Sequence, residues 1–148
     1  MMPDKIYNTE IKQVSHSAHH LTGEKICNLD YLKNISRGNE LLLEKFIQLF
    51  LEQTSTELNA LKSAISQLNY SAIAGIVHKL KSCFATMGIS RIEWVLIEME
   101  RLGSVTNDIE RIRSLSKNVN EVFCLAKTEL NQERLNYIIT KPPQIEIV

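Results

Sequence analysis

The sequence predicts an all-α fold: an antiparallel up-down-up-down four-helix bundle with a short extra helix at its start. Apolar residues recur every three or four positions in four long segments, which is the spacing of helices that each bury one face. No proline occurs between Tyr31 and Lys141, so nothing in that stretch interrupts a helix. The segments are joined by turns of about two to five residues, which favours antiparallel packing of successive helices.

The composition fits one globular domain. Of the 148 residues, 44% are hydrophobic and 23% are charged, which is enough to bury a core under a polar surface. Acidic and basic residues number 17 each, so the net charge gives no reason to expect nucleic acid or a membrane surface as a partner. No apolar run reaches the roughly 20 residues of a membrane-spanning helix. The lack of an apolar signal segment and the odd number of cysteines favour a cytoplasmic protein with reduced thiols.

Three regions are predicted along the chain: a mobile N-terminal arm at residues 1–27, the bundle at residues 28–141 and a C-terminal tail at residues 142–148. The arm is polar and contains His16, His19 and His20. His16 and His19 could share one face of a helix. No acidic or thiol partner accompanies them, so no metal site is predicted there.

A short helix comes first, with Asn28 as its expected cap and a break at residues 37–39. A long helix follows over about residues 39–67. Its predicted buried stripe is Leu43, Phe46 or Ile47, Phe50, Thr54, Leu58, Leu61, Ile65 and Leu68. Four leucines exceed this stripe, namely Leu41, Leu42, Leu49 and Leu51. We expect some of them to pack against the short helix, and the alternative is an exposed docking patch.

The third helix is predicted from its cap Asn69 to Gly88, a left-handed terminator. The fourth is expected to begin with a capping box between Ser90 and Glu93 and to stop at Gly103. The last helix is expected over residues 107–140, with Asn107 as its cap and a proline pair directly after its end.

The third helix carries the most distinctive surface. Its apolar stripe is Ile73, Val77, Leu80, Phe84 and Met87. At about 100° per residue, His78 points roughly 140° away from this stripe, and Lys81 lies one turn further on the same side. The other residues of that face are small, namely Ala74, Gly75, Ser82 and Ala85. Another protein could therefore approach this imidazole closely.

Other chemistry finds little support in the chain. The apolar stripes hold no paired carboxylates and no Glu-x-x-His metal motif, and the glycines do not form a nucleotide-binding loop. Cys83 lies about 80° off the stripe on the side away from His78, and we expect it to be packed. A neutral imidazole at His78 could attack phosphorus and hold a phosphoryl group. Lys81 would then partly neutralise the phosphoryl oxygens, and Ser82 could add a hydrogen bond.

The same stretch resembles the histidine-containing phosphotransfer (HPt) family of phosphorelays, whose motif is His-x-Leu-Lys, three small residues, two variable residues, an apolar residue and Gly. Here the motif reads His78, Lys79, Leu80, Lys81, Ser82, Cys83, Phe84, Ala85, Thr86, Met87 and Gly88, with Phe84 as the large exception. Further similarity lies at residues 29–32, 37–40, 50–52, 91–94 and 98–103. It covers roughly residues 28–135.

The resemblance implies a phosphoryl carrier rather than an enzyme. His78 would be phosphorylated, Lys81 would stabilise the phosphoryl charge, and Ala74, Gly75 and Ala85 would form the docking face. The partners implied are response-regulator receiver domains and a hybrid histidine kinase. The receiver would supply Mg²⁺, so the chain itself would need no cofactor or metal. Such carriers are typically monomers, although the leucines near Leu41 and residues 145–148 could support a dimer.

Two departures from the family pattern concern the site. Ser82 stands where the family most often has glycine, which narrows the approach to His78. Glu100 and Ser104 stand where some members place glutamine and arginine, and a carboxylate near His78 would repel phosphate. Two alternatives stay open: a non-catalytic adaptor of the same lineage, and the phosphotransfer module of a larger histidine kinase. A receiver phosphatase would need a Gln or Asn that this face does not clearly offer.

Overall fold

The computed structural model describes residues 24–106 and 108–140. Within these residues the chain is helical and contains no strand. The elements are α2 (Asp30–Ser36), α3 (Glu40–Ser66), α4 (Tyr70–Thr86), the 3-10 turn η1 (Ser90–Ile92), α5 (Glu93–Arg101), the π-helical turn η2 (Leu102–Thr106) and α6 (Ile109–Thr140). The histidines at positions 16, 19 and 20, the cap expected at Asn107 and the tail at 142–148 lie outside the described residues.

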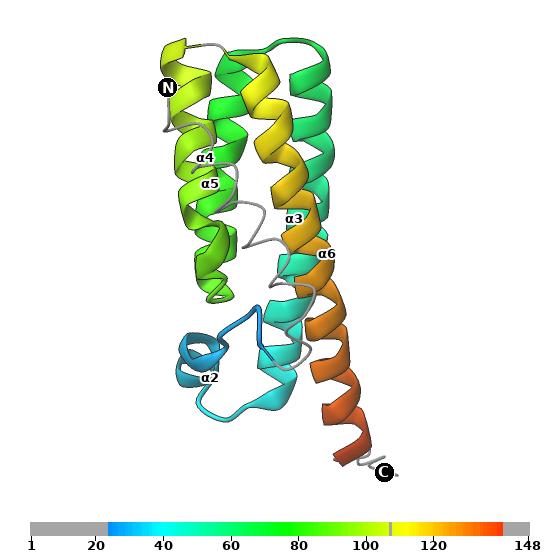
Figure 1. Cartoon of the computed structure of the whole chain (residues 1–148). Helices are drawn as coiled ribbons and strands as arrows, with labels where there is room; N and C mark the ends of the chain where they lie inside the picture. Colours follow the sequence, from blue (N-terminus) through cyan, green and yellow to red (C-terminus); the bar gives the residue numbers. More distant parts are fainter. Residues whose placement is uncertain (1–23, 107, 141–148) are drawn as a thin grey trace.

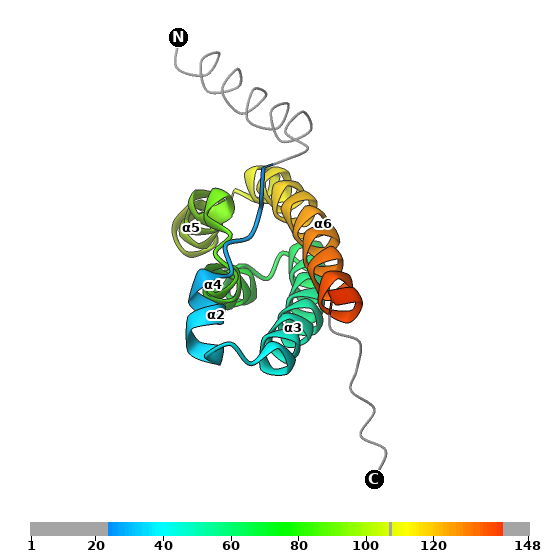
Figure 2. The same cartoon turned by 90° about the horizontal axis from the view of Figure 1, so that it is seen from below.

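The helices α3, α4, α5 and α6 form the predicted four-helix bundle, running alternately up and down (Figure 1). Each packs against the next helix in the chain, and α6 closes the ring by packing against α3. The pair α3 and α6 is longer than the pair α4 and α5, so it continues past them at one end of the bundle (Figure 1). The extra helix α2 lies at that end, beside α3 and below α4 (Figure 2).

The core forms where the apolar stripes of the four helices meet. The predicted stripe of α4 is confirmed, since Ile73, Val77, Leu80, Phe84 and Met87 are all buried. The ring of Phe50 on α3 meets the edge of Phe84 at a centroid distance of 5.8 Å and that of Phe123 on α6 at 6.0 Å. These aromatic contacts connect α3, α4 and α6 near the C-terminal end of α4.

Short polar side chains lie at the starts of three helices, and the cap predicted at Asn69 is confirmed. The Asn39 side chain accepts a hydrogen bond from the Leu42 amide, and the Asn69 side chain accepts one from the Ala72 amide, each at 3.1 Å. The Asn28 side chain accepts from the Asp30 amide, but the cap residue of α2 is Leu29, one position after the predicted Asn28, and it makes no side-chain cap bond. These bonds satisfy amides that have no partner inside their own helix.

Two predicted helix boundaries are wrong. The turn η1 and helix α5 have no side-chain cap, because a 3-10 turn starts at Ser90, directly after Ile89, and makes Glu93 the first residue of α5. Nor does the helix stop at Gly103, since the chain continues through η2 to Thr106. A Cβ at Gly103 would lie 3.2 Å from the Tyr70 carbonyl oxygen. This glycine therefore allows α4 and η2 to approach closely instead of ending a helix.

The surplus leucines of α3 do not cover α2 as expected. Leu41 is 70% exposed, and Leu42 and Leu49 are exposed as well, whereas Leu51 packs partly against the core. Leu68 is also exposed, because it lies past the end of α3 in the left-handed region at φ 55° and not on the buried stripe. Helical spacing shows which residues share a face but not which faces another element covers.

The segment before α2 is fastened to the bundle at two points. The Glu129 carboxylate on α6 accepts hydrogen bonds from the Ile26 amide at 3.0 Å and the Cys27 amide at 2.7 Å. The Asn28 amide donates to the carbonyl of Met87, the residue at the end of α4. Gly88 follows at φ 64°, where a Cβ would collide with the Asn28 carbonyl oxygen. The predicted left-handed terminator is therefore confirmed, and glycine also makes room for this segment.

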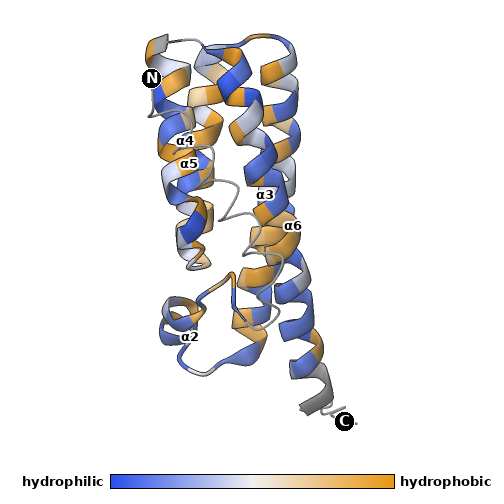
Figure 3. Cartoon of the chain, in the orientation of Figure 1, coloured by the Kyte–Doolittle hydropathy of each residue, from blue (hydrophilic) through white to orange (hydrophobic). Residues whose placement is uncertain are grey.

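Hydrophobic and hydrophilic residues are interspersed along every helix (Figure 3). Among the described residues, no helix has both the length and the apolar character needed to cross a membrane. The apolar residues of each long helix instead contribute to the shared core.

Candidate functional site

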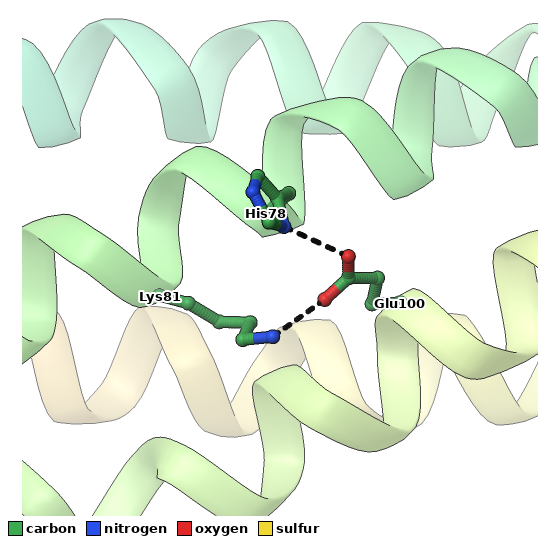
Figure 4. A network of polar contacts seen from close by, with 3 residues as sticks. All are labelled: His78, Lys81 and Glu100. Atoms are coloured by element: carbon green, nitrogen blue, oxygen red, sulfur yellow. Dashed lines mark hydrogen bonds and ion pairs between the residues drawn. The ribbon is translucent and has the colours of Figure 1, made fainter.

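A carboxylate, an ammonium and an imidazole meet at the boundary between α4 and α5 (Figure 4). One oxygen of Glu100, Oε1, lies 2.9 Å from His78 Nδ1. The other oxygen, Oε2, accepts a hydrogen bond from Lys81 Nζ at 2.8 Å. His78 and Lys81 come from α4 and Glu100 from α5, so the packing of two helices builds the cluster.

The buried stripes place these three side chains. Val77 and Leu80 anchor α4 in the core, which turns His78 and Lys81 toward the outer edge of the helix. Met99 on α5 is fully buried, and the next residue, Glu100, lies at the rim facing α4. The His78 side chain is 69% exposed, against 33% for Lys81 and 27% for Glu100. The imidazole is thus the most accessible member of the cluster.

The carboxylate selects which nitrogen of the imidazole carries the proton. The hydrogen bond from Lys81 holds the pKa of the Glu100 carboxyl below its usual value, and the bond to His78 acts in the same direction. An ionised carboxylate can only accept hydrogen bonds, so His78 Nδ1 must carry the proton in this contact. In the neutral ring the other nitrogen, Nε2, then keeps its lone pair. The site therefore offers Nε2 as a nucleophile.

Small residues leave the outer face of α4 open beside His78. Gly75 is exposed, and a Cβ built there would meet no atom within 4 Å. Ser82 and Ala85 are exposed too, whereas Ala74 is half-buried next to Gly103. Of the residues predicted to form the docking face, Gly75 and Ala85 lie at the surface and Ala74 only partly so.

Two residues, Lys79 and Cys83, lie at the edge of this face that is nearest to α3. Lys79 lies 3.7 Å from Glu57 in an ion pair that links α4 to α3. Cys83 is partly buried against the core, as its angle on the helix predicts, and burial raises the pKa of its thiol. A raised thiol pKa disfavours the reactive thiolate, so Cys83 does not compete with His78 as the nucleophile.

Sequence reasoning identified His78 and Lys81 but treated Glu100 only as a possible source of repulsion. It missed that one carboxylate holds both residues. The sequence feature that could have indicated this contact is the position of Glu100 directly after Met99 of the apolar stripe. That position places Glu100 at the edge of α5. The register between α4 and α5 was needed to show what it contacts. A separate pocket of about 370 Å³ lies between residues 25–33 and α6, and none of the predicted site residues line it.

Comparison with known proteins identifies the class of protein to which this bundle and its surface histidine belong. The family model of the Hpt domain matches residues 45–134, a span that contains His78, Lys81 and Glu100. The chain belongs to the Hpt domain family. Family membership supports a histidine phosphotransfer role in phosphorelays, as a carrier of phosphoryl groups rather than a true enzyme.

The fold is also similar to a crystal structure of histidine-containing phosphotransfer protein B from Pseudomonas aeruginosa PAO1. The TM-score is 0.70 at 17% sequence identity, and the match covers 78% of this chain and 99% of that one. At this identity the likeness establishes the helical bundle fold. No curated protein sequence matches the chain significantly.

Proposed function

We propose that the chain is a phosphorelay intermediate that carries a phosphoryl group on His78 and exchanges it with aspartates of receiver domains. The observation that carries the proposal is the hydrogen bond between His78 Nδ1 and the ionised Glu100, which leaves Nε2 as an exposed nucleophile. Membership in the Hpt domain family supports the same chemistry.

The transfer step follows from this arrangement. The Nε2 lone pair attacks the phosphorus of an aspartyl phosphate, and the bond between phosphorus and the aspartate oxygen breaks, with its electrons leaving on the carboxylate. His78 keeps its Nδ1 proton, so the phosphorylated ring is positively charged. Lys81 is proposed to stabilise the phosphoryl oxygens, and Ser82 to donate a hydrogen bond to them. Transfer to an acceptor aspartate reverses the step.

The proposed partners are the receiver of a hybrid histidine kinase and one or more response regulators. The exposed surface at Gly75 and Ala85 supports this proposal, because it lets a receiver bring its aspartate to the imidazole. Mg²⁺ would be bound by the receiver, and docking would align the acyl phosphate with Nε2. We propose that the exchange takes place in the cytoplasm and that the chain acts as a monomer.

Phosphotransfer profiling tests this function. The purified protein is mixed with a panel of phosphorylated receivers, and acid-labile phosphate on the chain is followed over time. We expect rapid labelling of the wild type and none of His78→Gln. A matched control replaces the other three histidines, at positions 16, 19 and 20, with glutamine and should be labelled like the wild type. No labelling of the wild type by any receiver would overturn the proposal and favour an adaptor in which His78 is incidental.

A further inference from the structure

Glu100 has two partners, one for each of its oxygens. Oε1 holds the Nδ1 proton of His78, and Oε2 holds the ammonium of Lys81. While the His78 ring is neutral, the negative charge of Glu100 is balanced by Lys81 alone. The two contacts are independent, because either partner can leave without breaking the bond to the other.

Phosphorylation changes the charges at this cluster. A phosphoryl group on Nε2 adds about two negative charges, while the ring that retains its Nδ1 proton gains one positive charge. If Lys81 stayed on Glu100, the phosphoryl group would have no cation beside it. If Lys81 left, Glu100 would still face a positive ring through its Oε1 contact.

We propose that Glu100 exchanges its counter-ion when His78 is phosphorylated: the charged imidazole replaces Lys81 as the partner of the carboxylate, and Lys81 moves to the phosphoryl group. This inference rests on the proposed function, since it describes the phosphorylated state of the same histidine. It also accounts for a carboxylate at a position where it would otherwise repel the phosphoryl group.

The structure supports the exchange in two ways. Lys81 lies three residues after His78 on the same helix and is 33% exposed, so its flexible stem can swing from Glu100 toward Nε2. The neighbouring cation on α4, Lys79, lies toward α3 instead of α5, and it is paired there with Glu57. Figure 4 shows Lys81 and His78 reaching the carboxylate from successive turns of one helix.

The exchange has a consequence for the transfer rates. As the bond between Nε2 and phosphorus forms, positive charge develops on the ring next to the Glu100 carboxylate, which stabilises it. When that bond breaks, its electron pair returns to Nε2 and the ring leaves as neutral imidazole. Glu100 thus acts as a positioning residue that favours acceptance of the phosphoryl group and its retention on His78, whereas Lys81 acts on the phosphoryl group itself.

The test compares the wild type with Glu100→Gln and with a matched control, Glu98→Gln. Glu98 lies on the same helix but pairs with Arg101. Glutamine can still accept the Nδ1 hydrogen bond but carries no charge. We expect Glu100→Gln to slow acceptance by about three- to tenfold, the scale of a partly exposed charge pair, without slowing donation, while Glu98→Gln keeps the wild-type rates. Equal rates in the wild type and Glu100→Gln would overturn the inference.

A spectroscopic measurement reads the exchange directly. Nitrogen NMR of the unphosphorylated wild type should show the proton of His78 on Nδ1. Phosphorylation with phosphoramidate, a small chemical donor, should shift the Lys81 Nζ signal while Nδ1 stays protonated. An unchanged Lys81 signal would overturn the exchange. Because this donor needs no receiver, the exchange can hold even if receivers fail to label the protein, in which case only the proposed function fails.

Discussion

Glu100 accepts a hydrogen bond from His78 across the boundary between α4 and α5, at 2.9 Å between Oε1 and Nδ1. The contact joins an acidic residue to the nucleophile of a phosphotransfer site, where a negative charge is at first sight unfavourable. Because Lys81 shares the same carboxylate, the resting cluster carries no unpaired charge. The pair therefore orients the imidazole without leaving an isolated anion beside the incoming phosphoryl group.

The same contact predicts how stability depends on pH. Lys81 first, and His78 second, lower the pKa of Glu100 in the folded protein relative to the unfolded chain. The stabilisation is therefore fully present above the ordinary carboxyl pKa and is lost as the pH falls through the lowered value. By urea unfolding, Glu100→Gln should be less stable than the wild type by about 0.2–1 kcal/mol at pH 7, with the gap closing in acid. A gap of the same size in acid would contradict this assignment.

Substitutions at Gly75 should affect docking of the receiver without lowering the stability of the fold. A Cβ there meets nothing within 4 Å, so Gly75→Ala should stabilise the helix by about 0.5–1 kcal/mol. Gly75→Gln should also fold at least as stably as the wild type but slow phosphotransfer at least about tenfold, because its side chain stands beside the imidazole.

The control for this prediction is Ser114→Gln, an equally exposed change on α6, which stands diagonally across the bundle from α4 (Figure 2). It should leave the transfer rate unchanged. Wild-type transfer by Gly75→Gln would show that this part of α4 does not face the receiver.

Much of the fold could be predicted because it depends on local patterns. The stripe of α4 and its cap Asn69 involve residues within a few positions of one another, and the structure confirms them. Gly103 was misread because a glycine that ends a helix and one that admits a neighbouring backbone look alike in sequence. Leu41 was misread because periodicity does not show how far α2 reaches over α3.

The candidate site could likewise be predicted only in part from the sequence. The shared face of His78 and Lys81 follows from their spacing on one helix, so it was visible in the sequence. The contact between His78 and Glu100 depends on the register of two antiparallel helices. The two residues are 22 positions apart in the sequence. A shift of one turn would pair His78 with a different residue of α5. Only the packed structure fixes that register.

Glu129 is predicted to hold the segment before α2 in place. Glu129→Ala removes the acceptor of the Ile26 and Cys27 amides and should destabilise the protein by about 2 kcal/mol in urea unfolding. Glu129→Gln keeps one acceptor oxygen and should lose about half as much. Hydrogen exchange supplies the local readout, since the amides of Ile26 and Cys27 should exchange faster in Glu129→Ala. Unchanged exchange at both amides would show that the carboxylate does not hold this segment.

Two glycines, Gly38 and Gly88, have a left-handed backbone conformation, so the same substitution can be compared at both positions. Gly38 and Gly88 have φ of 76° and 64°, so alanine pays a similar backbone strain of about 1 kcal/mol at either position. A Cβ at Gly38 meets nothing within 4 Å, whereas one at Gly88 collides with the Asn28 carbonyl oxygen. Relieving that collision requires residue 28 to move and weakens its hydrogen bond to Met87 at the end of α4.

Gly88→Ala should therefore destabilise the protein by about 1–3 kcal/mol more than Gly38→Ala, as measured by urea unfolding. The amide of Asn28 should also lose hydrogen-exchange protection in Gly88→Ala but keep it in Gly38→Ala. Equal losses of stability in the two variants would mean that backbone strain alone explains the glycine at position 88. A larger loss with an exposed Asn28 amide would show that the end of α4, the helix that carries His78, is held in place by the segment that crosses it.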